Sequence, residues 1–466
     1  MLEQFIKNRI ISHLSFAPNK GQNELLEQLS QFVVSPITKK AFILLGYAGT
    51  GKTSIVAALV EAYKELQQKV VLLAPTGRAA KVLSHYAHSP AYTIHKYIYR
   101  QKKLGEDVFC LNDNLHRNTL FIIDEASMIS GIRDNTTFGS GMLLDDLIKY
   151  VYSGEGCSLL FLGDNAQLPP IGSSISPALD CDYIVKYGLH LTHCRLTEVA
   201  RQALDSEILG NASRIRPIAL REEMPPHSVW DILHAEQDCV FIPASEVVER
   251  LEQSYNEVGL EEVIFLTRTN IRTNRYNQGI RTRILWREED IENGDRLMVS
   301  KNNYFWTEQY DDLPFLANGD TLEISRLRNV REMYGFRFAD VQLQSLDYDW
   351  EIDAVVWLDT LYSDSPEANN ALHRQLFERI AEDYPELAHN KKKLAETIYK
   401  SEYYNALQVR FAYAVTGHKS QGGQWKHVYI DPYKGGELHA DEEGFYRWLY
   451  TAVTRASEKV YFIKNE

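Results

Sequence analysis

The sequence predicts an α/β fold with two similar parallel-sheet domains that face a cleft. Short apolar runs alternate with longer helical segments, the pattern of buried parallel strands and their connecting helices. This alternation occurs twice, first from Phe42 and again from Cys239, and only the first set carries a glycine-rich phosphate-loop motif. The second set is interrupted by Thr321–Gln408, which opens with β-like runs and predicts an inserted small β-barrel or sheet.

The glycine-rich loop fits the pattern G-x-x-x-x-G-K-[ST] from Gly46 to Thr53. An apolar run precedes it and a helical run follows, which is the context that this motif requires. Glycines let the backbone N–H groups approach phosphate oxygens, and the helix directs its positive end at the same anion. The sequence therefore predicts a nucleoside triphosphate site, in which Lys52 reaches the β- and γ-phosphates and Thr53 ligates Mg²⁺. Its expected residues are Gly46, Ala48, Gly49, Thr50, Gly51, Lys52, Thr53 and Ser54.

Length and composition indicate a globular protein of about three domains, since the chain has 466 residues. Hydrophobic residues make up 44% of the chain and charged residues 24%, as in ordinary soluble proteins. No apolar run approaches the roughly 20 residues of a membrane span, and the N-terminus lacks a signal-peptide core. We therefore expect a cytoplasmic protein without a membrane partner. The net charge of −13 argues against a general basic coat, although a local basic channel stays compatible with it.

The five cysteines show no C-x-x-C spacing, which fits a reducing compartment. Cys181, His190, His193 and Cys194 are residue types that bind zinc. Their spacing is irregular, so we favour ordinary packing for all four.

Polar residues follow two later strands of the first set, at the sheet edge where α/β folds bind ligands. One apolar run ends in Asp124 and Glu125. Asp124 can hold Mg²⁺, and Glu125 can orient or deprotonate the attacking water. Another strand leads to Gln167, whose amide can sense whether a γ-phosphate is present.

Two arginines that lie far along the chain, Arg201 and Arg455, are candidates for the same site. An arginine that reaches a transferring γ-phosphoryl group accelerates the reaction by ~10³–10⁵. Arg455 alone is equally compatible with a surface salt bridge. Both arginines are candidates only because a nucleotide cleft of this kind needs such residues.

Two further segments suit nucleic acid. Tyr92–Lys103 mixes aromatic rings with lysines and an arginine, which fits single strands whose bases stack and whose phosphates need neutralising. A solvated amphipathic helix explains that segment equally well. Thr416–Gln421 forms a polar, glycine-containing turn ahead of a strand, and such a loop can contact a phosphate or a nucleic-acid backbone.

Taken in order, the motifs resemble those of superfamily 1B helicases, in the RecD-like and Dda-like (Pif-type) branch. They cover most of the chain and read GYAGTGKT, APTGRAA, TIH, IIDEAS, LGDNAQLPPI, LTEVARQA, NGD, VTGHKSQG and YTAVTRA. The resemblance implies two RecA-like parallel-sheet motor domains, a small pin subdomain and an inserted SH3-like β subdomain. It also implies ATP and Mg²⁺ as cofactors, and single-stranded DNA and 5′-tailed duplex DNA as partners. Proteins of a repair, recombination or replication complex are further candidate partners.

The resemblance assigns roles to single residues. Gln22 matches the glutamine that reads adenine, and Gln167 matches the γ-phosphate sensor. Arg201 and Arg455 match the two arginines directed at the γ-phosphate. The implied catalytic set is Lys52, Glu125, Gln167, Arg201 and Arg455. The implied DNA contacts, with Phe109 as the tip of the strand-separating pin, are Thr76, Gly77, Thr93, His95, Phe109, Thr416, His418 and Ser420.

The implied domains are residues 1–90 and 118–200 (first motor), 91–117 (pin), 201–320 and 409–466 (second motor) and 321–408 (inserted). The sequences HKSQG and GDNAQLPP resemble the branch that moves 5′ to 3′, so we expect a DNA helicase of that polarity. Three alternatives stay open. They are a nucleic-acid-stimulated ATPase that acts on RNA or remodels protein–nucleic-acid complexes, a subunit that only binds ATP, and a 3′-to-5′ motor.

Overall fold

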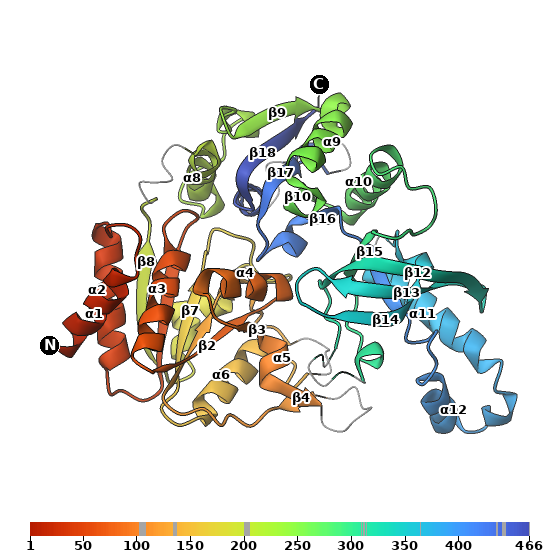
Figure 1. Ribbon diagram of the computed structural model, residues 1–466, viewed down its shortest axis with the longest axis horizontal. Coiled ribbons are helices and arrows are strands. Elements are labelled where there is room, and N and C mark those ends of the chain that lie inside the picture. Colours follow the sequence, from red (N-terminus) through yellow and green to blue (C-terminus); the bar gives the residue numbers. More distant parts are fainter. Residues whose placement is uncertain are drawn as a thin grey trace. The chain divides into compact units, whose positions relative to one another are not determined.

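Two compact units make up the computed structural model shown in Figure 1. The first unit combines Met1–Ala244 with Ser420–Glu466, and the second is Ser245–Lys419. The structure describes residues 1–101, 109–133, 138–199, 206–308, 310, 313, 315–363, 365–434, 437–439 and 444–465.

The first unit contains a fully parallel, six-stranded sheet. In spatial order its strands are β3 (Ala91–Thr93), β2 (Lys69–Ala74), β6 (Thr119–Ile123), β7 (Ser158–Gly163), β1 (Lys40–Gly46) and β8 (His190–Leu196). Every residue of β6 and β7, and all but the first of β1, is buried. Strands buried on both faces need continuous apolar runs, which is why the sequence could predict them.

Helices surround this sheet and form its core with it. They are α1 (Leu2–Ser12), α2 (Lys20–Val34), α3 (Lys52–Glu65), α4 (Gly77–Ala87), α5 (Ile94–Ile98), α6 (Leu143–Ser153) and α7 (Cys181–Val185). Leu25 of α2, Leu59 of α3 and Phe42 of β1 belong to one apolar cluster and are fully buried. This cluster fixes α3 against the sheet, so the N-terminus of α3 stays at the carboxyl end of β1.

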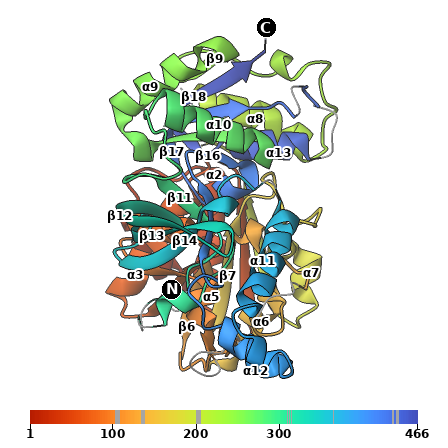
Figure 2. The ribbon, with the colours of Figure 1, turned by 90° about the vertical axis from the view of Figure 1, so that its right-hand side faces the viewer.

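The second set of parallel strands begins at Cys239, as predicted. In the first unit β17 (Trp425–Asp431), β18 (Ala456–Lys464) and β9 (Cys239–Pro243) pair in parallel in that order. The helices α8 (Glu207–Ala219) and α13 (Phe445–Val453) pack against each other beside them (Figure 2). In the second unit β10 (Val263–Thr267) pairs in parallel with β16 (Ala414–Thr416), next to α9 (Val247–Val258) and α10 (Asn270–Arg283).

A closed barrel confirms the predicted inserted β subdomain. Its strands are β11 (Arg296–Val299), β12 (Thr321–Met333), β13 (Phe336–Ser345), β14 (Glu351–Trp357) and β15 (Leu407–Phe411). The helices α11 (Pro366–Ala381) and α12 (Lys391–Ile398) contribute to an apolar cluster with the barrel residues Phe338 and Trp357. The barrel takes more of the chain than Thr321–Gln408, because β11 pairs with both β12 and β15 and so closes the cylinder.

The predicted pin segment contains a β-hairpin in which β4 (Tyr99–Gln101) pairs antiparallel with β5 (Phe109–Leu111). Phe109, the residue expected at the tip of the pin, is packed in the interior of the protein. Phe109 is 3% exposed and starts a strand, and its ring centroid lies 4.7 Å from that of Phe138. Phe109 pairs with Gln101 at the end of the hairpin next to the loop, but the apolar surface of its ring is already removed from water.

The second unit is held together by a buried charge network around Asp295, which is fully buried immediately before β11. Arg281 of α10 donates to both carboxylate oxygens of Asp295, over 3.0 and 2.8 Å. Arg287 donates to the same carboxylate over 2.7 Å, and the hydroxyl of Tyr413 does so over 2.8 Å. One carboxylate thus connects α10, the barrel and the segment that leads into β16.

We expect Asp295→Asn to destabilise the second unit by ~3–5 kcal/mol, because it leaves two arginines without their buried counter-charge. The measurement is the free energy of unfolding by denaturant. The matched control is Asp353→Asn, which removes a partner of Arg328 from a pair whose side chains are 45% and 53% exposed. That pair should contribute about 0–1 kcal/mol. Equal losses in the two variants would contradict a structural role for the buried network.

Candidate nucleotide-binding site

The phosphate-loop motif forms a tight turn between β1 and α3. Gly49 and Gly51 have φ of 73° and 84°, a left-handed backbone that favours glycine. At Gly51 a Cβ atom would also lie 2.8 Å from Nε2 of Gln22. Lys52 is the first residue of α3, and its ammonium group donates to the carbonyl oxygens of Gly46 and Tyr47. The helix N-terminus and the lysine therefore both lie at the loop, as binding a polyphosphate requires.

Acidic side chains lie at the ends of the strands beside β1. Asp124 and Glu125 follow β6, and Asp164 follows β7. The Asp124 N–H donates to the carbonyl of Leu73 over 2.9 Å, which continues the sheet to its last residue. Because all strands are parallel, their carboxyl ends meet at one edge, and the three carboxylates lie there together.

The pKa values of these groups reflect burial and mutual charge. Burial raises the pKa of Asp124, and the neighbouring Glu125 raises it further. Burial lowers the pKa of Lys52. The carboxylates of Asp164, Glu125 and Asp124 oppose this effect and raise the pKa, because they favour the charged ammonium group. Glu125 has a φ of 49°, an uncommon conformation for a residue with a side chain. Backbone strain of this kind persists only where the surrounding structure enforces it.

Arg455 lies beside this acidic edge. Its side chain is 5% exposed, and its guanidinium nitrogen NH1 is 3.6 Å from Oε1 of Glu125. The guanidinium also donates to the carbonyls of Thr451, over 3.2 Å, and Gly423, over 3.3 Å. Arg455 is thus buried next to Glu125, and the alternative of a surface salt bridge is excluded. Arg201 lies outside the described residues.

Gln167 lies in the loop after β7 and is 6% exposed. Among the residues that the structure describes, its Oε1 atom has no hydrogen-bond partner although it is buried. Neighbouring atoms of the loop are held by the C-terminal segment, because the Leu168 N–H donates to Oγ1 of Thr451 and Arg447 donates to the carbonyl of Asn165, both over 2.9 Å. A buried acceptor without a partner fits a ligand or a water at this position.

Gln22 is buried at the start of α2, and both ends of its amide are hydrogen-bonded within the protein. Its Oε1 accepts from the N–H of Asn19, and its Nε2 donates to the carbonyl of Thr50, both over 3.0 Å. The Asn19 side chain in turn accepts from the Gln22 N–H, which completes a capping box. Gln22 therefore fastens α2 to the phosphate loop. Its reading of adenine stays a prediction.

Two residues of the site were not singled out from the sequence. Asp164 follows β7 as Asp124 follows β6, so the same strand-end argument could have found it. Tyr450 of α13 is 1% exposed, and its hydroxyl lies between the phosphate loop and Asp164. An aromatic residue on an apolar helix gives no sequence signal of such a role.

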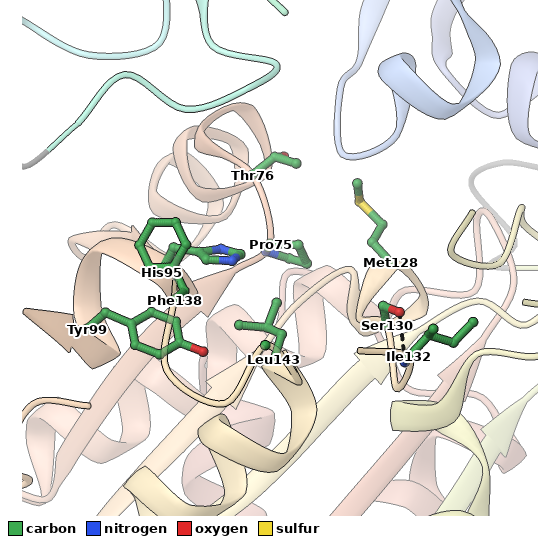
Figure 3. A pocket seen from close by; sticks show the side chains of 10 residues that line it. Pro75, Thr76, His95, Tyr99, Met128, Ser130, Ile132, Phe138 and Leu143 are labelled. Carbon is green, nitrogen blue, oxygen red and sulfur yellow. Dashed lines mark hydrogen bonds between the residues drawn. The ribbon is translucent and has the colours of Figure 1, made fainter. Parts of the chain in front are cut away.

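A pocket of about 220 Å³ adjoins the carboxyl ends of β2 and β3 in the first unit. Figure 3 shows His95, Tyr99 and Phe138 together on one side of it, and Met128, Ser130 and Ile132 on the other. The remaining lining residues are Pro75, Thr76, Gly141 and Leu143. Two predicted DNA contacts, Thr76 and His95, therefore lie in one pocket. Burial lowers the pKa of His95 to about 4, so its ring is neutral at physiological pH.

Gly77 follows Thr76 as the first residue of α4, and the hydroxyl of Thr76, the N-cap residue, accepts from the N–H of Ala79. Thr93 is the N-cap of α5, and its hydroxyl accepts from the N–H of Lys96. Thr416 ends β16 in the second unit, and His418 follows it there. Burial lowers the pKa of His418.

Ser420 is fully buried in the first unit. The chain beyond it approaches α4 closely, because a Cβ atom at Gly422 would lie 2.6 Å from that of Ala79.

Among the described residues, no three His, Cys, Asp or Glu side chains gather as a metal site, and this holds for the histidines and cysteines considered for zinc. In the same residues no helix combines the length and the apolar character that a membrane span needs.

The fold and the site define a P-loop nucleotide-binding protein with two parallel-sheet domains. Residues 18–217 match the AAA domain family, and residues 411–463 match the UvrD-like helicase C-terminal domain. The chain is 25% identical over 517 residues to the uncharacterised protein R530 of Acanthamoeba polyphaga mimivirus, covering 95% of this chain and 98% of that protein. It is 24% identical over 454 residues to the ATP-dependent DNA helicase dda of Enterobacteria phage T4, covering 90% and 93%.

A third relative is the ATP-dependent RecD2 DNA helicase of Deinococcus radiodurans, 25% identical over 201 residues, which are 42% of this chain and 24% of that protein. A solved structure of two coordinating Pif1 helicases at forked double-stranded DNA has a TM-score of 0.48 and 14% identity, covering 96% of this chain and 92% of that one. The matched families and relatives bear out the resemblance of the chain to superfamily 1B helicases of the RecD-like and Dda-like (Pif-type) branch.

We expect Lys52→Ala to lower the affinity for ATP by about 10- to 100-fold, because charge-assisted hydrogen bonds to phosphate are lost. Binding of a fluorescent ATP analogue measures this, and hydrolysis should fall below detection. The matched control is Lys64→Ala on the same helix, whose side chain is 40% exposed and pairs with Glu61. Turnover retained by Lys52→Ala would remove this lysine from the site.

Proposed function

We propose that the protein is an ATP-driven DNA helicase that moves 5′ to 3′ along single-stranded DNA and separates the duplex ahead of it. The observation that carries this proposal is the position of Arg455, which is buried 3.6 Å from Glu125 at the edge that also carries Lys52. A site that only binds a nucleotide needs neither a water-activating carboxylate nor an arginine beside it. The pair indicates hydrolysis.

The described residues fit ATP with Mg²⁺. Left-handed glycines, the N-terminus of α3 and Lys52 suit the phosphates, and Thr53 with Asp124 would hold the metal ion. When bound, Mg²⁺ would neutralise charge on the transferring phosphoryl group. Glu125 would take the proton of the attacking water.

The free acceptor Oε1 of Gln167 would orient the attacking water. Arg455, with Arg201, would stabilise the developing charge on the phosphoryl group.

The pocket around His95 supports single-stranded nucleic acid as the partner. The neutral imidazole of His95 is partly exposed and offers a flat face, the buried rings of Tyr99 and Phe138 pack around it, and Met128 lies across the pocket. Bases stack on such faces without regard to sequence. Thr76 and Gly77 at the start of α4, Thr93, Thr416, His418 and Ser420 are the further proposed contacts with the strand.

The hairpin of β4 and β5 is the proposed strand separator. Its strands are joined by residues that lie outside the described part of the chain, so we assign the separating role to the hairpin as a whole and no longer to Phe109.

The sequence motifs and the relatives support the proposed direction of movement and the proposed DNA substrate. The sequences GDNAQLPP and HKSQG favour 5′-to-3′ movement, and two relatives are named as ATP-dependent DNA helicases. A nucleic-acid-stimulated ATPase that acts on RNA or on protein–nucleic-acid complexes is the second candidate, since base stacking alone does not separate DNA from RNA. Proteins of a repair, recombination or replication complex are proposed partners.

The decisive experiment compares duplexes with a 5′ or a 3′ single-stranded tail under identical ATP and salt. The 5′-tailed duplex should be unwound and the 3′-tailed one should not. Stimulation of ATP hydrolysis by single-stranded DNA, with RNA of the same sequence as control, identifies the nucleic acid. Unwinding of only the 3′-tailed duplex would reverse the polarity, and stimulation by RNA alone would replace the substrate.

We expect Arg455→Ala to retain nucleotide binding within about threefold while kcat for ATP falls by ~10³ or more, as for arginines that contact the transferring phosphoryl group. Nucleotide affinity and steady-state hydrolysis, measured on the same preparation, separate the two effects. If binding and turnover fell together with the melting temperature, the arginine would be a structural residue only.

A further inference from the structure

The hydroxyl of Tyr450 joins three segments of the first unit that are far apart in sequence. It donates to Oδ2 of Asp164 over 2.6 Å and accepts from the N–H of Ala48 over 3.1 Å. Ala48 belongs to the phosphate loop, Asp164 follows β7, and Tyr450 lies in α13. The side chain of Tyr450 is 1% exposed, so both hydrogen bonds form away from water and contribute more than exposed ones.

Asp164 carries this link on to the nucleotide site. Its other oxygen, Oδ1, accepts from the N–H of Ala166 over 2.9 Å, which leaves Oδ2 for Tyr450. The charge of Asp164 acts on Lys52, the residue expected at the phosphates. The tyrosine hydroxyl therefore fixes the direction of a carboxylate that favours the charged form of Lys52 against the effect of burial.

The helix that carries Tyr450 also positions Arg455. Arg455 lies just beyond the end of α13, and its guanidinium donates to the carbonyl of Thr451. Oγ1 of Thr451 accepts from the N–H of Leu168, next to Gln167. The position of α13 against the phosphate loop therefore determines the position of Arg455 relative to Glu125.

We propose that Tyr450 is a positioning residue for ATP hydrolysis, whose hydroxyl holds α13 to the phosphate loop and to Asp164 and thereby keeps Arg455 in reach of Glu125. The inference rests on the proposed function. The hydroxyl of Tyr450 is bonded to Ala48 and Asp164, so the role proposed for it is to hold these segments and not to bind the nucleotide. Its effect on the reaction is exerted through Arg455 and Asp164.

The same helix provides a matched control. Tyr446 lies one turn before Tyr450 in α13 and is 7% exposed. Its hydroxyl is buried and has no hydrogen-bond partner among the described residues. Tyr446→Phe and Tyr450→Phe remove the same atom from the same helix, and they differ in the hydrogen bonds that are lost.

In the full chain, Tyr450→Phe should lower kcat of DNA-stimulated ATP hydrolysis by about tenfold or more, the loss expected for a buried hydrogen bond to a charged group. Affinity for ADP should stay within about twofold, and Tyr446→Phe should retain wild-type kcat. Wild-type kcat in Tyr450→Phe would overturn the inference. So would a fall of kcat and ADP affinity together with the melting temperature, which would make the residue structural.

The double variant Tyr450→Phe with Asp164→Asn tests whether the two residues act as one unit. Its loss of kcat should be smaller than the product of the two single losses, because each substitution breaks the same link. Multiplying losses would show independent action and would contradict the proposal. Absence of nucleic-acid-stimulated hydrolysis in the wild-type chain would instead reject the proposed function, so the two failures are distinguishable.

Discussion

The burial of opposite charges at one sheet edge is the constraint on which the rest of the structure depends. Lys52 and Arg455 lie there with the carboxylates of Asp124, Glu125 and Asp164. An isolated charge in such a place would cost several kcal/mol, so each is tolerated because the others are close. Parallel strands bring their carboxyl ends to this edge, and the apolar core under α3 holds the lysine against them. The continuous apolar strands of the sequence are therefore a condition for the chemistry.

The C-terminal segment completes this edge from a distant part of the chain. Thr451 and Arg447 of α13 hold the loop that carries Gln167, and Tyr450 holds the phosphate loop. Burying a polar side chain costs free energy unless the side chain is hydrogen-bonded. In α13 the buried side chains of Tyr450 and Thr451 form these hydrogen bonds with the nucleotide site. Three residues of YTAVTRA, namely Tyr450, Thr451 and Arg455, therefore have polar functions, although the segment reads as an apolar helix followed by one arginine.

Patterns with strong local rules were predictable from the sequence, and contacts made across the fold were not. The left-handed turn at Gly49 and Gly51, the strand ending in Asp124 and the barrel follow from short-range signals. Asp164 directly follows a buried strand, as Asp124 does, so the sequence could have predicted it. In that segment only Gln167 was singled out. Tyr450 carries no such signal, because its partners lie hundreds of residues away. The burial of Phe109 against Phe138 could not be predicted either, because an apolar residue in a hairpin suits an exposed and a buried position equally well by pattern.

The way in which the barrel closes limits how the chain can be shortened. β11 lies outside the segment from β12 to β15 in which the sequence suggested an insertion, yet it pairs with the strands at both ends of that segment. Excision of residues 321–408 would remove β12 and leave the N–H and C=O groups on that edge of β11 unpaired, while Val409–Phe411 would still pair with the other edge. Unpaired edges of this kind recruit other chains. The first strand of the barrel therefore belongs to the part of the second unit that precedes the insertion. A chain shortened by residues 321–408 should aggregate through the exposed edge of β11.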